Sequence, residues 1–545
     1  LSPASQILSS TWYGGGGTDN FTAVSVDEQG IATLFGNTRS SDLPTTPNAF
    51  SATFGGGTFD AILTRLDLTQ AGAQQLLYAT YIGGSGNEFV SNSILVDGSV
   101  VTFTGSTLSA NYPTTANAWS QTYAGGGGTD GILTRIDISQ PPASQLVYSS
   151  YFGSAGADAG SAIALDPAGR VAIFGTSSSA TFPVTANAYD STLGGPGDTI
   201  LALFDLTLPP AQQIVYATYF GGNAGDTAPA MQIDRNGAFC ICGHTFSTDF
   251  PVTANAFDTT FATQDAYFVR LDPSLAPANQ LTYSTFAGGT AAESATSLLV
   301  DAAGVITMSG GTTSTDFPVT DGAFQATNGG GFQDTWVVRI DPARPPTEQL
   351  LYSTYLGGDG LESLFCLAME EMGGVWAVGF TQSTNFPTTP NGVGGSPNGA
   401  NDAFVAHLDM LPTGVSAYGS SSPGCNGPIV ASVTSMPRVG NTHFAMTCTN
   451  MTPPAIGLIG ISLVPAVFPT TVLGIDVWVD TTLLQTVFLA TTNYGAQALM
   501  PIPADAGLIG LPIAAQFAWY EGGVGPTCPS LGWSASHALY FLVQP

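Results

Sequence analysis

Short runs in which apolar and polar residues alternate recur along the first three-quarters of the chain. Residues 161–166 (SAIALD), 170–176 (RVAIFGT), 198–205 (DTILALFD) and 214–220 (IVYATYF) are four such runs in one stretch. They are rich in Val, Ile, Tyr and Phe and are bounded by Gly, Pro and Asp, which is typical of β-strands joined by tight turns. The pattern therefore predicts four strands in this stretch and an all-β fold.

This four-strand pattern is one copy of a repeat. An aromatic or Leu residue precedes Pro at six places: Leu43-Pro44, Tyr112-Pro113, Phe182-Pro183, Phe250-Pro251, Phe317-Pro318 and Phe386-Pro387. Eight residues before each Pro there is a glycine: Gly36, Gly105, Gly175, Gly243, Gly310 and Gly379. Four strands make one propeller blade, so six copies predict a six-bladed β-propeller of four-stranded blades.

The start of the chain is expected to close this ring. The sixth copy supplies three strands and ends with 402–409 (DAFVAHLD), whereas 6–13 (QILSSTWY) matches the fourth strand at 145–152 (QLVYSSYF). We therefore expect the N-terminal strand to complete the last blade, which leaves only short, protected edges. The propeller is predicted over 1–417, with copies at approximately 7–76, 77–146, 147–214, 215–281, 282–350 and 351–417.

Several of these elements together resemble a known repeat family. They are 351–358 (LYSTYLGG), the turn 166–169 (DPAG), the Phe-Pro-Thr-Thr element and 402–405 (DAFV). This combination is similar to the repeat of bacterial secreted β-propellers that is often called the seven-bladed-propeller repeat, over residues 6–411. The resemblance implies a secreted or surface bacterial protein of a family without a general enzymatic activity, although this chain has six copies.

The repeat stops near Tyr418, and a second domain is predicted over 418–545. Its alternating runs 474–479 (GIDVWV), 485–489 (QTVFL) and 538–543 (ALYFLV) are separated by Pro and Gly, which predicts a small β-sandwich. The domain is similar to C-terminal modules on secreted proteins of aquatic bacteria. Cys425 and Cys528 are its candidate disulfide, and Cys448 is an alternative partner for either.

Composition and charge limit the classes of partner and the cellular locations that we expect. The formal net charge is −29, and all nine basic residues are Arg, which excludes nucleic acid, anionic lipid and chemistry that needs Lys. The most apolar run, 455–468, contains Pro465 and is too short to span a membrane. The chain opens as a processed protein would, so a secreted, extracellular or cell-surface location is expected after removal of a signal peptide.

Two series of acids recur once per copy. The third strand opens with Asp, which we expect to bond backbone N–H groups of the preceding loop: Asp60, Asp130, Asp198, Asp265, Asp334 and Asp402. The second series lies in Gly-rich loops between copies and comprises Asp19, Glu88, Asp158, Asp226, Glu293 and Glu362. These carboxylates are candidate Ca²⁺ ligands, with solvated loop acids as the alternative; no other cofactor is expected.

Four arginines stand two residues before an Asp. The pairs are Arg65 and Asp67, Arg135 and Asp137, Arg270 and Asp272, and Arg339 and Asp341. Because residues i and i+2 share one face of a strand, the spacing predicts four same-face ion pairs.

Motifs for catalysis are missing from the sequence. It has four His and no HExxH, GxSxG or Walker pattern, and the residues that break the repeat are explained by packing or turns. The chain is therefore predicted not to be an enzyme but an extracellular or cell-surface structural or adhesive protein. Its propeller would be a rigid platform for protein partners or self-assembly, without membrane insertion. The alternatives are a glycan-binding module and a hydrolase with an atypical site in the central channel.

Overall fold

The computed structural model describes residues 10–543 except 28, 302–303, 370–373, 390–399, 412–414, 426, 434–436, 442–443, 452–453, 473–474, 480–484, 492–494 and 522–532. The chain divides into two compact units. One comprises Leu1–Thr253 with Gln264–Thr285, and the other comprises Ala254–Thr263 with Phe286–Pro545. None of the helices in the described residues is long and apolar enough to cross a membrane.

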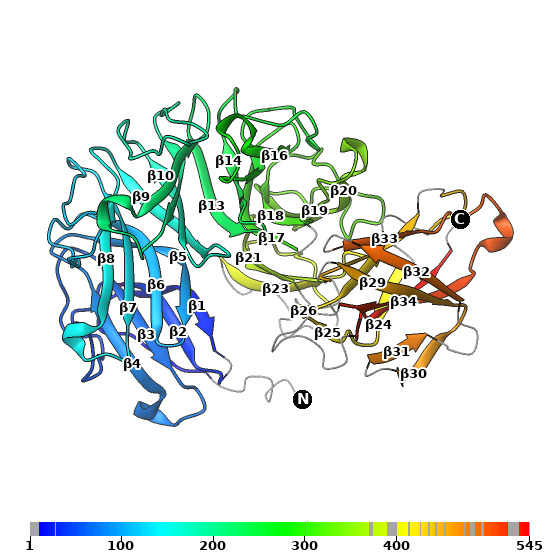
Figure 1. The fold of residues 1–545 in the computed structure, drawn as a ribbon, viewed down its shortest axis with the longest axis horizontal. Coiled ribbons are helices and arrows are strands. Elements are labelled where there is room, and N and C mark those ends of the chain that lie inside the picture. Colours follow the sequence, from blue (N-terminus) through cyan, green and yellow to red (C-terminus); the bar gives the residue numbers. More distant parts are fainter. Residues whose placement is uncertain are drawn as a thin grey trace. The chain divides into compact units, whose positions relative to one another are not determined.

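The first unit consists of four antiparallel sheets of four consecutive strands each (Figure 1). The first sheet contains β1 (Asp19–Val26), β2 (Ala32–Thr38), β3 (Asp60–Leu66) and β4 (Leu76–Ile82). The second contains β5 (Glu88–Asp97), β6 (Val100–Thr107), β7 (Asp130–Asp137) and β8 (Leu146–Phe152). The third contains β9 (Asp158–Leu165), β10 (Val171–Ser177), β11 (Asp198–Phe204) and β12 (Ile214–Phe220). The fourth contains β13 (Asp226–Ile233), β14 (Phe239–Thr245), β15 (Asp265–Leu271) and β16 (Leu281–Ala287).

The second unit begins with two more sheets of this kind. The fifth sheet contains β17 (Glu293–Val300), β18 (Ile306–Thr312), β19 (Asp334–Ile340) and β20 (Leu350–Leu356). The sixth has three strands among the described residues, β21 (Glu362–Met369), β22 (Val375–Thr381) and β23 (Asp402–Leu408). A short 3-10 helix precedes the fourth strand of each complete sheet: η2 (Gly72–Gln75), η3 (Pro142–Ser144), η4 (Pro210–Gln212), η5 (Pro277–Asn279) and η6 (Pro346–Glu348).

The C-terminal strands of the second unit build a separate group of sheets. The largest has the order β24 (Val415–Tyr418), β36 (Ala538–Leu542), β34 (Pro512–Tyr520), β29 (Ala455–Ser462) and β32 (Gln485–Thr491), with β35 (Trp533–Ala535) beside β34. Smaller sheets pair β25 (Pro423–Gly424) with β26 (Gly427–Pro428), β30 (Pro465–Val472) with β31 (Ile475–Val479), and β27 (Val430–Val433) with β28 (Ala445–Thr449) and β33 (Gly495–Leu499). The remaining helix is η7 (Ala506–Leu508). Trp519, Phe517 and Phe541 are fully buried in the core of this group.

The prediction of an all-β chain with four-stranded antiparallel sheets is confirmed. Closure of a six-bladed ring stays a prediction. In the predicted closing strand, residues 6–9 lie outside the described residues, and residues 10–13 are not in a strand. The domain boundary at 417/418 also stays a prediction.

In every one of the six sheets, the repeating glycine stands where the backbone leaves no room for a side chain. Gly36 on β2 lies beside a bulge in β1, where the register shifts between Phe21 and Ala23. A Cβ atom on Gly36 would collide with the backbone carbonyl oxygen of Asn20. The glycines of the other five copies meet the same obstacle: Gly105, Gly175, Gly243, Gly310 and Gly379.

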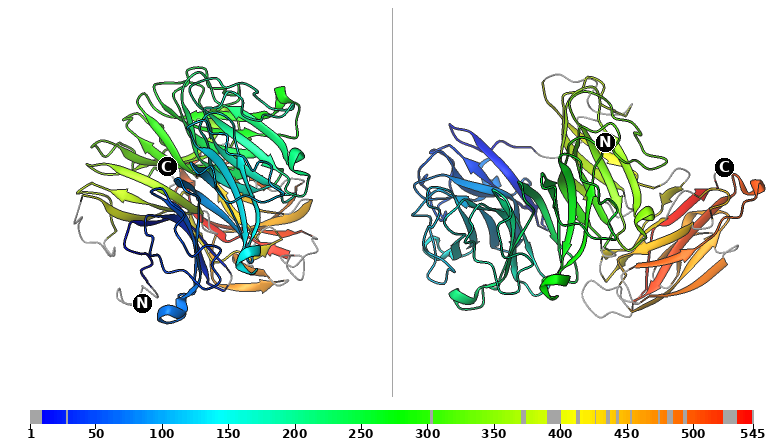
Figure 2. Two further views of the ribbon diagram at one scale, coloured as in Figure 1. Left: turned by 90° about the vertical axis from the view of Figure 1, so that its left-hand side faces the viewer. Right: turned by 90° about the horizontal axis from the view of Figure 1, so that it is seen from above.

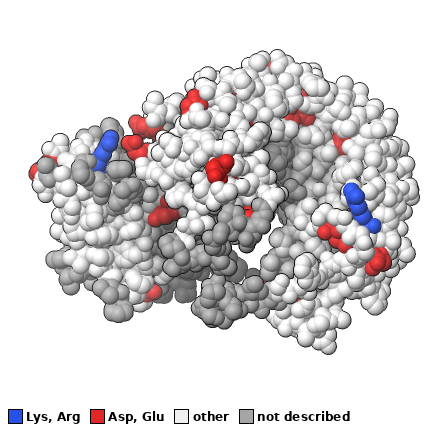
Figure 3. Space-filling view, turned by 180° about the vertical axis from the view of Figure 1, so that it is seen from behind, with Lys and Arg blue, Asp and Glu red and all other residues white. Residues whose placement is uncertain are grey.

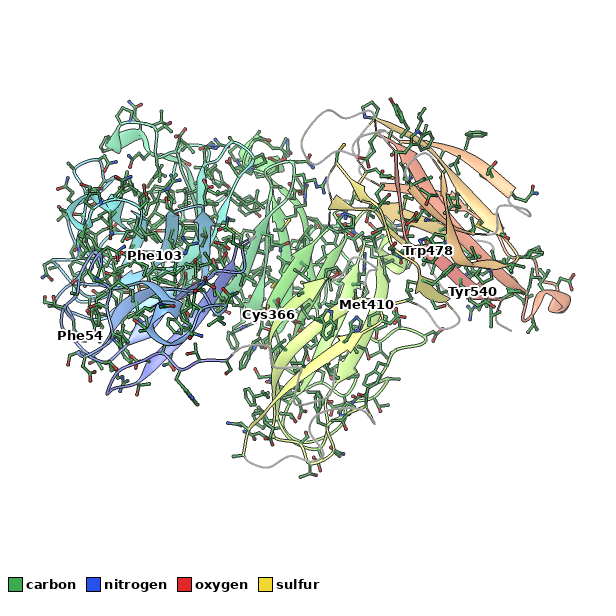
Figure 4. The ribbon with its side chains drawn as sticks, turned by 90° about the horizontal axis from the view of Figure 1, so that it is seen from below. Phe54, Phe103, Cys366, Met410, Trp478 and Tyr540 are labelled. Carbon is green, nitrogen blue, oxygen red and sulfur yellow. The ribbon has the colours of Figure 1, made fainter. Side chains whose placement is uncertain are left out.

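Neighbouring sheets pack through apolar side chains, and we call the contact between one sheet and the next a seam. At the seam between the first and second sheets, the rings of Phe35 and Phe103 lie 4.3 Å apart and are both fully buried; Phe103 is labelled in Figure 4. Within the first unit, the first strand of each sheet contacts that of the next, β1 with β5, β5 with β9 and β9 with β13 (Figures 1 and 2). In the second unit β17 contacts β21 in the same way.

Candidate functional site

The two recurring series of acids meet at the seams. Asp60 opens β3 of the first sheet and Glu88 opens β5 of the second, and these two strands are in contact. The same meeting of third strand and next first strand occurs for β7 with β9, β11 with β13 and β19 with β21. The acids at these four seams, which are fully or almost fully buried, are Asp60 and Glu88, Asp130 and Asp158, Asp198 and Asp226, and Asp334 and Glu362.

The third-strand Asp closes the loop that precedes it. The Gly55 N–H donates a hydrogen bond to Oδ2 of Asp60, and the Ala124 N–H donates to Oδ2 of Asp130. Gly194 binds Asp198 in the same way at 2.7 Å. A short carboxylate thus satisfies a backbone donor of each loop, which would otherwise be buried without an acceptor. The Asp402 side chain of the sixth sheet is partly exposed.

The first-strand acid accepts hydrogen bonds from two hydroxyl groups and a glycine-rich loop. At Glu88, Oε1 accepts from Thr107 (2.8 Å), from Ser109 (2.5 Å) and from the Gly84 N–H (3.3 Å). These hydroxyls come two and four residues after the repeating glycine. This Gly-x-Ser/Thr-x-Ser pattern occurs in all six copies, at 36–40, 105–109, 175–179, 243–247, 310–314 and 379–383. Sequence reasoning missed these hydroxyls, although their constant distance from the glycine could have identified them.

The donor groups around the second series do not fit the predicted Ca²⁺ site. Hydroxyl and amide groups donate protons to these carboxylates, whereas a calcium ion needs six to eight oxygen atoms whose lone pairs face it. Asp19 follows the same pattern, with hydrogen bonds from Ser40 (2.9 Å), Thr38 and the Gly15 N–H. Glu293 does so too, with Thr312 at 2.6 Å and the Gly289 N–H at 3.0 Å. Among the described residues, no group of three or more acids, His or Cys is arranged to hold a metal ion.

Burial shifts the ionisation of the seam acids. Desolvation raises the pKa of Glu88 to about 7, and the nearby Asp60 charge adds to this rise. Desolvation likewise raises the pKa of Asp130 and of Asp334 to about 6. Carboxyl groups with such values carry protons at a pH where ordinary surface acids are ionised.

The four predicted same-face ion pairs are wrong. Arg65 pairs with Asp27 at 2.8 Å, Arg339 pairs with Asp301 at 3.2 Å and Arg270 pairs with Asp234. These partners are the acids of the turn after the first strand of the same sheet. No ion pair joins Arg135 to Asp137 or to another acid in the described part of the chain.

The predicted partners have a different role because the strand has already ended or is ending there. Since β3 stops at Leu66, Asp67 lies beyond it and the alternation of faces no longer applies. Asp67 accepts hydrogen bonds from the Thr69 N–H and hydroxyl, which makes it a turn residue. The equivalent acids bind their turns in the same way, Asp137 through Ser139, Asp272 through Ser274 and Asp341 through Ala343.

A tyrosine and a glutamine connect neighbouring sheets, and sequence reasoning missed them. The Tyr78 hydroxyl of β4 donates to Oε1 of Gln145, just before β8, at 2.7 Å. Gln145 in turn donates to the backbone oxygen of Asn48 in the first sheet at 2.8 Å. The same bonds join Tyr148 to Gln213 and Tyr216 to Gln280.

A surface cluster beside the first seam breaks the repeat and combines a positive charge with aromatic rings. The guanidinium carbon of Arg39 is 4.2 Å from the centroid of the Phe59 ring, and the Phe59 ring is 6.3 Å from that of Phe89. Arg39 and Phe89 are exposed, and Arg39 forms no ion pair with any described residue. We call Arg39, Phe59 and Phe89 the Arg39 patch.

None of the three residues of the Arg39 patch recurs. The other copies have Leu108, Ser178, Phe246, Thr313 and Gln382 in place of Arg39. They have Thr129, Gly197, Gln264, Gln333 and Asn401 in place of Phe59, and Asn20, Ala159, Thr227, Ser294 and Ser363 in place of Phe89. Basic side chains are sparse on the molecular face in Figure 3, where acids stand singly rather than in a broad field.

The cysteines separate into bonded and free groups. Cys425 is disulfide-bonded, whereas Cys240, Cys242, Cys366 and Cys448 are free. Cys366, labelled in Figure 4, lies on β21. Cys528 lies outside the described residues, so its pairing with Cys425 stays a prediction.

Comparisons with known proteins give distant structural likeness. No family model and no curated protein matches the chain. Among solved structures, it is similar to the polysaccharide lyase Uly1, with 10% identity, coverage of 82% of this chain and 92% of that one, and a TM-score of 0.33. It is similar to the extracellular domain of a one-component system from B. thetaiotaomicron (11% identity, 100% and 57% coverage, TM-score 0.30). It is also similar to sucrose-6-phosphate hydrolase from Lactobacillus gasseri (7% identity, 95% and 91% coverage, TM-score 0.23).

These structures correct one expectation from the sequence. The prediction that the chain is not an enzyme is wrong, because the structures it is similar to include a lyase and a hydrolase. The low TM-scores mean that this likeness assigns no reaction or substrate to the chain.

Proposed function

We propose that this protein is an extracellular glycan-binding protein and that the Arg39 patch contacts the sugar. The observation that carries the proposal is the patch itself, in which an exposed Arg that forms no ion pair with a described residue covers one aromatic ring beside a second, exposed ring. All three residues are absent from the equivalent positions of the other five copies.

The chemistry of the patch suits a sugar ring. A flat aromatic side chain offers an apolar surface for the C–H face of a sugar, while a few placed polar groups fix its orientation. Arg39 offers a fork of N–H donors that suits hydroxyl groups and, in bidentate form, a carboxylate. The Arg39 backbone N–H donates to the Thr18 carbonyl at 2.9 Å, and the Phe59 carbonyl accepts from the Glu88 N–H at 3.0 Å, so the backbone positions of both residues are held.

A glycan array with neutral and acidic oligosaccharides tests this function. We expect wild-type protein to bind, and Phe89→Ala and Arg39→Gln each to weaken binding by about tenfold, which is about 1.4 kcal/mol. Phe246→Ala is the matched control, because Phe246 is exposed and occupies the Arg39 position of the fourth sheet; its binding should stay within about twofold of wild type. An array without any wild-type signal, or an equal loss in the control, contradicts the proposal.

The extracellular location is supported by the disulfide at Cys425. Disulfides form and persist in oxidising environments and are rare in the cytosol. A structural or adhesive role with protein partners or self-assembly remains a prediction from the sequence.

We also propose that the six sheets close into one ring. Two observations support closure, each made on one unit alone. In the sixth sheet Trp376 and Val378 of β22 are exposed, although the equivalent positions of β14 hold the buried Cys240 and Cys242. In the first sheet Val24 is 62% exposed, whereas its equivalents Ile163 and Leu298 are buried. Residues 6–13 would then supply the fourth strand that the sixth sheet lacks among the described residues.

A further inference from the structure

The seam between the first and second sheets contains two carboxyl oxygens that no hydrogen-bond donor reaches. Oδ2 of Asp60 and Oε1 of Glu88 accept the bonds described above. The other two oxygens, Oδ1 of Asp60 and Oε2 of Glu88, are buried and have no donor. Two ionised carboxylates in this position would repel each other in a medium that screens charge poorly.

These two bare oxygens lie against the same glycine. A Cβ atom placed on Gly83 would be 2.5 Å from Oε2 of Glu88 and 2.8 Å from Oδ1 of Asp60. A hydrogen bond between these two oxygens would need a proton, because an ionised carboxylate can only accept.

We propose that Asp60 and Glu88 bind one proton between them, and that Asp334 and Glu362 form a second proton-binding pair of the same design. The second pair has a related geometry. Oδ1 of Asp334 is buried without a donor, and a Cβ atom on Gly357 would meet both this oxygen and Oε2 of Glu362. Oε2 of Glu362 also accepts from the Gly358 N–H at 3.1 Å.

The seams with an Asp on the first strand differ in the donors that reach their oxygens. Both oxygens of Asp198 accept backbone N–H groups, from Gly194 and Gly195, and both oxygens of Asp158 accept hydroxyl groups, from Ser177 and Ser179. Among the four described seams, only the first has a carboxyl oxygen without a donor on both acids.

Among the described residues, no Arg forms an ion pair with either acid of the first pair, although Arg39 stands over Phe59 beside the same seam. The neighbouring titratable groups are the hydroxyls of Tyr81 on β4, of Tyr112 after β6 and of Tyr151 on β8. Burial raises the pKa of all three tyrosines, so they are neutral at physiological pH. No Arg is among the groups that shift Asp60 or Glu88.

The sign of the pH effect follows from the direction of the shift. Burial raises the pKa of Glu88 to about 7 in the folded chain, above the ordinary value of a Glu carboxyl. An acid whose pKa is raised on folding stabilises the fold fully at pH values below its pKa in the unfolded chain. This stabilisation is lost as the pH rises through its pKa in the folded chain. The seam is therefore most stable in acid, and it loses this stabilisation as the pH rises from the ordinary Glu pKa to about 7.

Glu88→Gln tests the proposal, because the amide supplies a permanent N–H donor to Asp60 in place of the shared proton. We expect the opening equilibrium of wild-type peptides around β3 and β5, measured by hydrogen exchange, to rise roughly 100-fold between pH 5 and pH 9. In Glu88→Gln this rise should shrink to a few-fold. Asp205→Asn is the matched control, because it removes one charge from an exposed turn acid whose pKa is lowered.

An infrared titration of the wild-type protein gives a second readout that does not depend on the stability of any variant. The carbonyl stretch of a protonated carboxylic acid should be present at pH 6 in the wild-type protein. It should be weaker by one carboxyl group in Glu88→Gln, in which Asp334 and Glu362 keep their proton. A wild-type protein without this band, or a variant with the full pH response, overturns the proposal. Recovery of slow hydrogen exchange at this seam at pH 8 on addition of stoichiometric Ca²⁺ would also overturn the proposal, since the pair would then bind a metal cation rather than a proton.

Discussion

Replacing Tyr78 by Phe should weaken the contact between the first two sheets. The change removes the hydroxyl that donates to Oε1 of Gln145 at 2.7 Å and accepts from the Phe50 N–H at 3.3 Å. Gln145 is fully buried, so its oxygen cannot find water in compensation. Leaving a buried acceptor unsatisfied costs about 1–3 kcal/mol, and we expect a loss of this size in the opening free energy of the seam.

Hydrogen exchange followed by mass spectrometry is the suitable assay, because a chain of several sheets and a C-terminal module need not unfold in one step. Peptides that cover β4 and β8 should exchange faster in Tyr78→Phe, while those of the C-terminal sheets should not change. Tyr520→Phe is the control, since Tyr520 is exposed and an exposed substitution of this kind changes stability by less than about 0.5 kcal/mol.

A double-mutant cycle isolates the bond from other effects of each change. Tyr78→Phe and Gln145→Leu together should cost less than the sum of the single changes by about 1 kcal/mol, because both remove the same bond. Additive effects within about 0.3 kcal/mol would refute the idea that this bond connects the sheets.

Two further predictions concern the ends of the chain. Cys425→Ser should lower the stability of the C-terminal module by about 2–5 kcal/mol, since the predicted bridge to Cys528 closes a long loop; a non-reduced digest without a peptide joining the two residues would contradict the pairing. Removal of residues 1–13 should lower the melting temperature of the propeller by exposing the edge of β23, as measured by calorimetry, and an unchanged melting temperature would argue against ring closure.

The positions of the strands could be predicted from the sequence because the repeat marks them six times. Each repeating glycine lies on the second strand of its sheet, and each third-strand Asp opens its strand. What the sequence did not reveal is which side chains meet across sheets. Asp60 and Glu88 are separated by 28 residues, as are Asp334 and Glu362. This constant spacing is a signal, yet it gives no direction for either side chain.

The errors have a common physical origin. The pairing of Arg65 with Asp67 assumed that the strand continued to Asp67, but β3 ends at Leu66. The first-strand acids were interpreted as Ca²⁺ ligands or solvated acids of the Gly-rich loops, whereas the loops fold over them and bring serine and threonine hydroxyls into reach. In both cases the residue lies at the boundary between a strand and a loop. Its contacts there differ from those expected within the strand or within the loop.

Recurrence separates the two kinds of residue on which the proposals depend. The first-strand acids recur in every copy and accept hydrogen bonds from the same recurring glycine and hydroxyl pattern, so they hold the sheets together wherever they occur. The Arg39 patch is the opposite case, because no seam needs Arg39 or Phe89 at these positions in the other copies. A binding site in a ring of repeats must differ from one copy to the next, and in the first unit the Arg39 patch has that property.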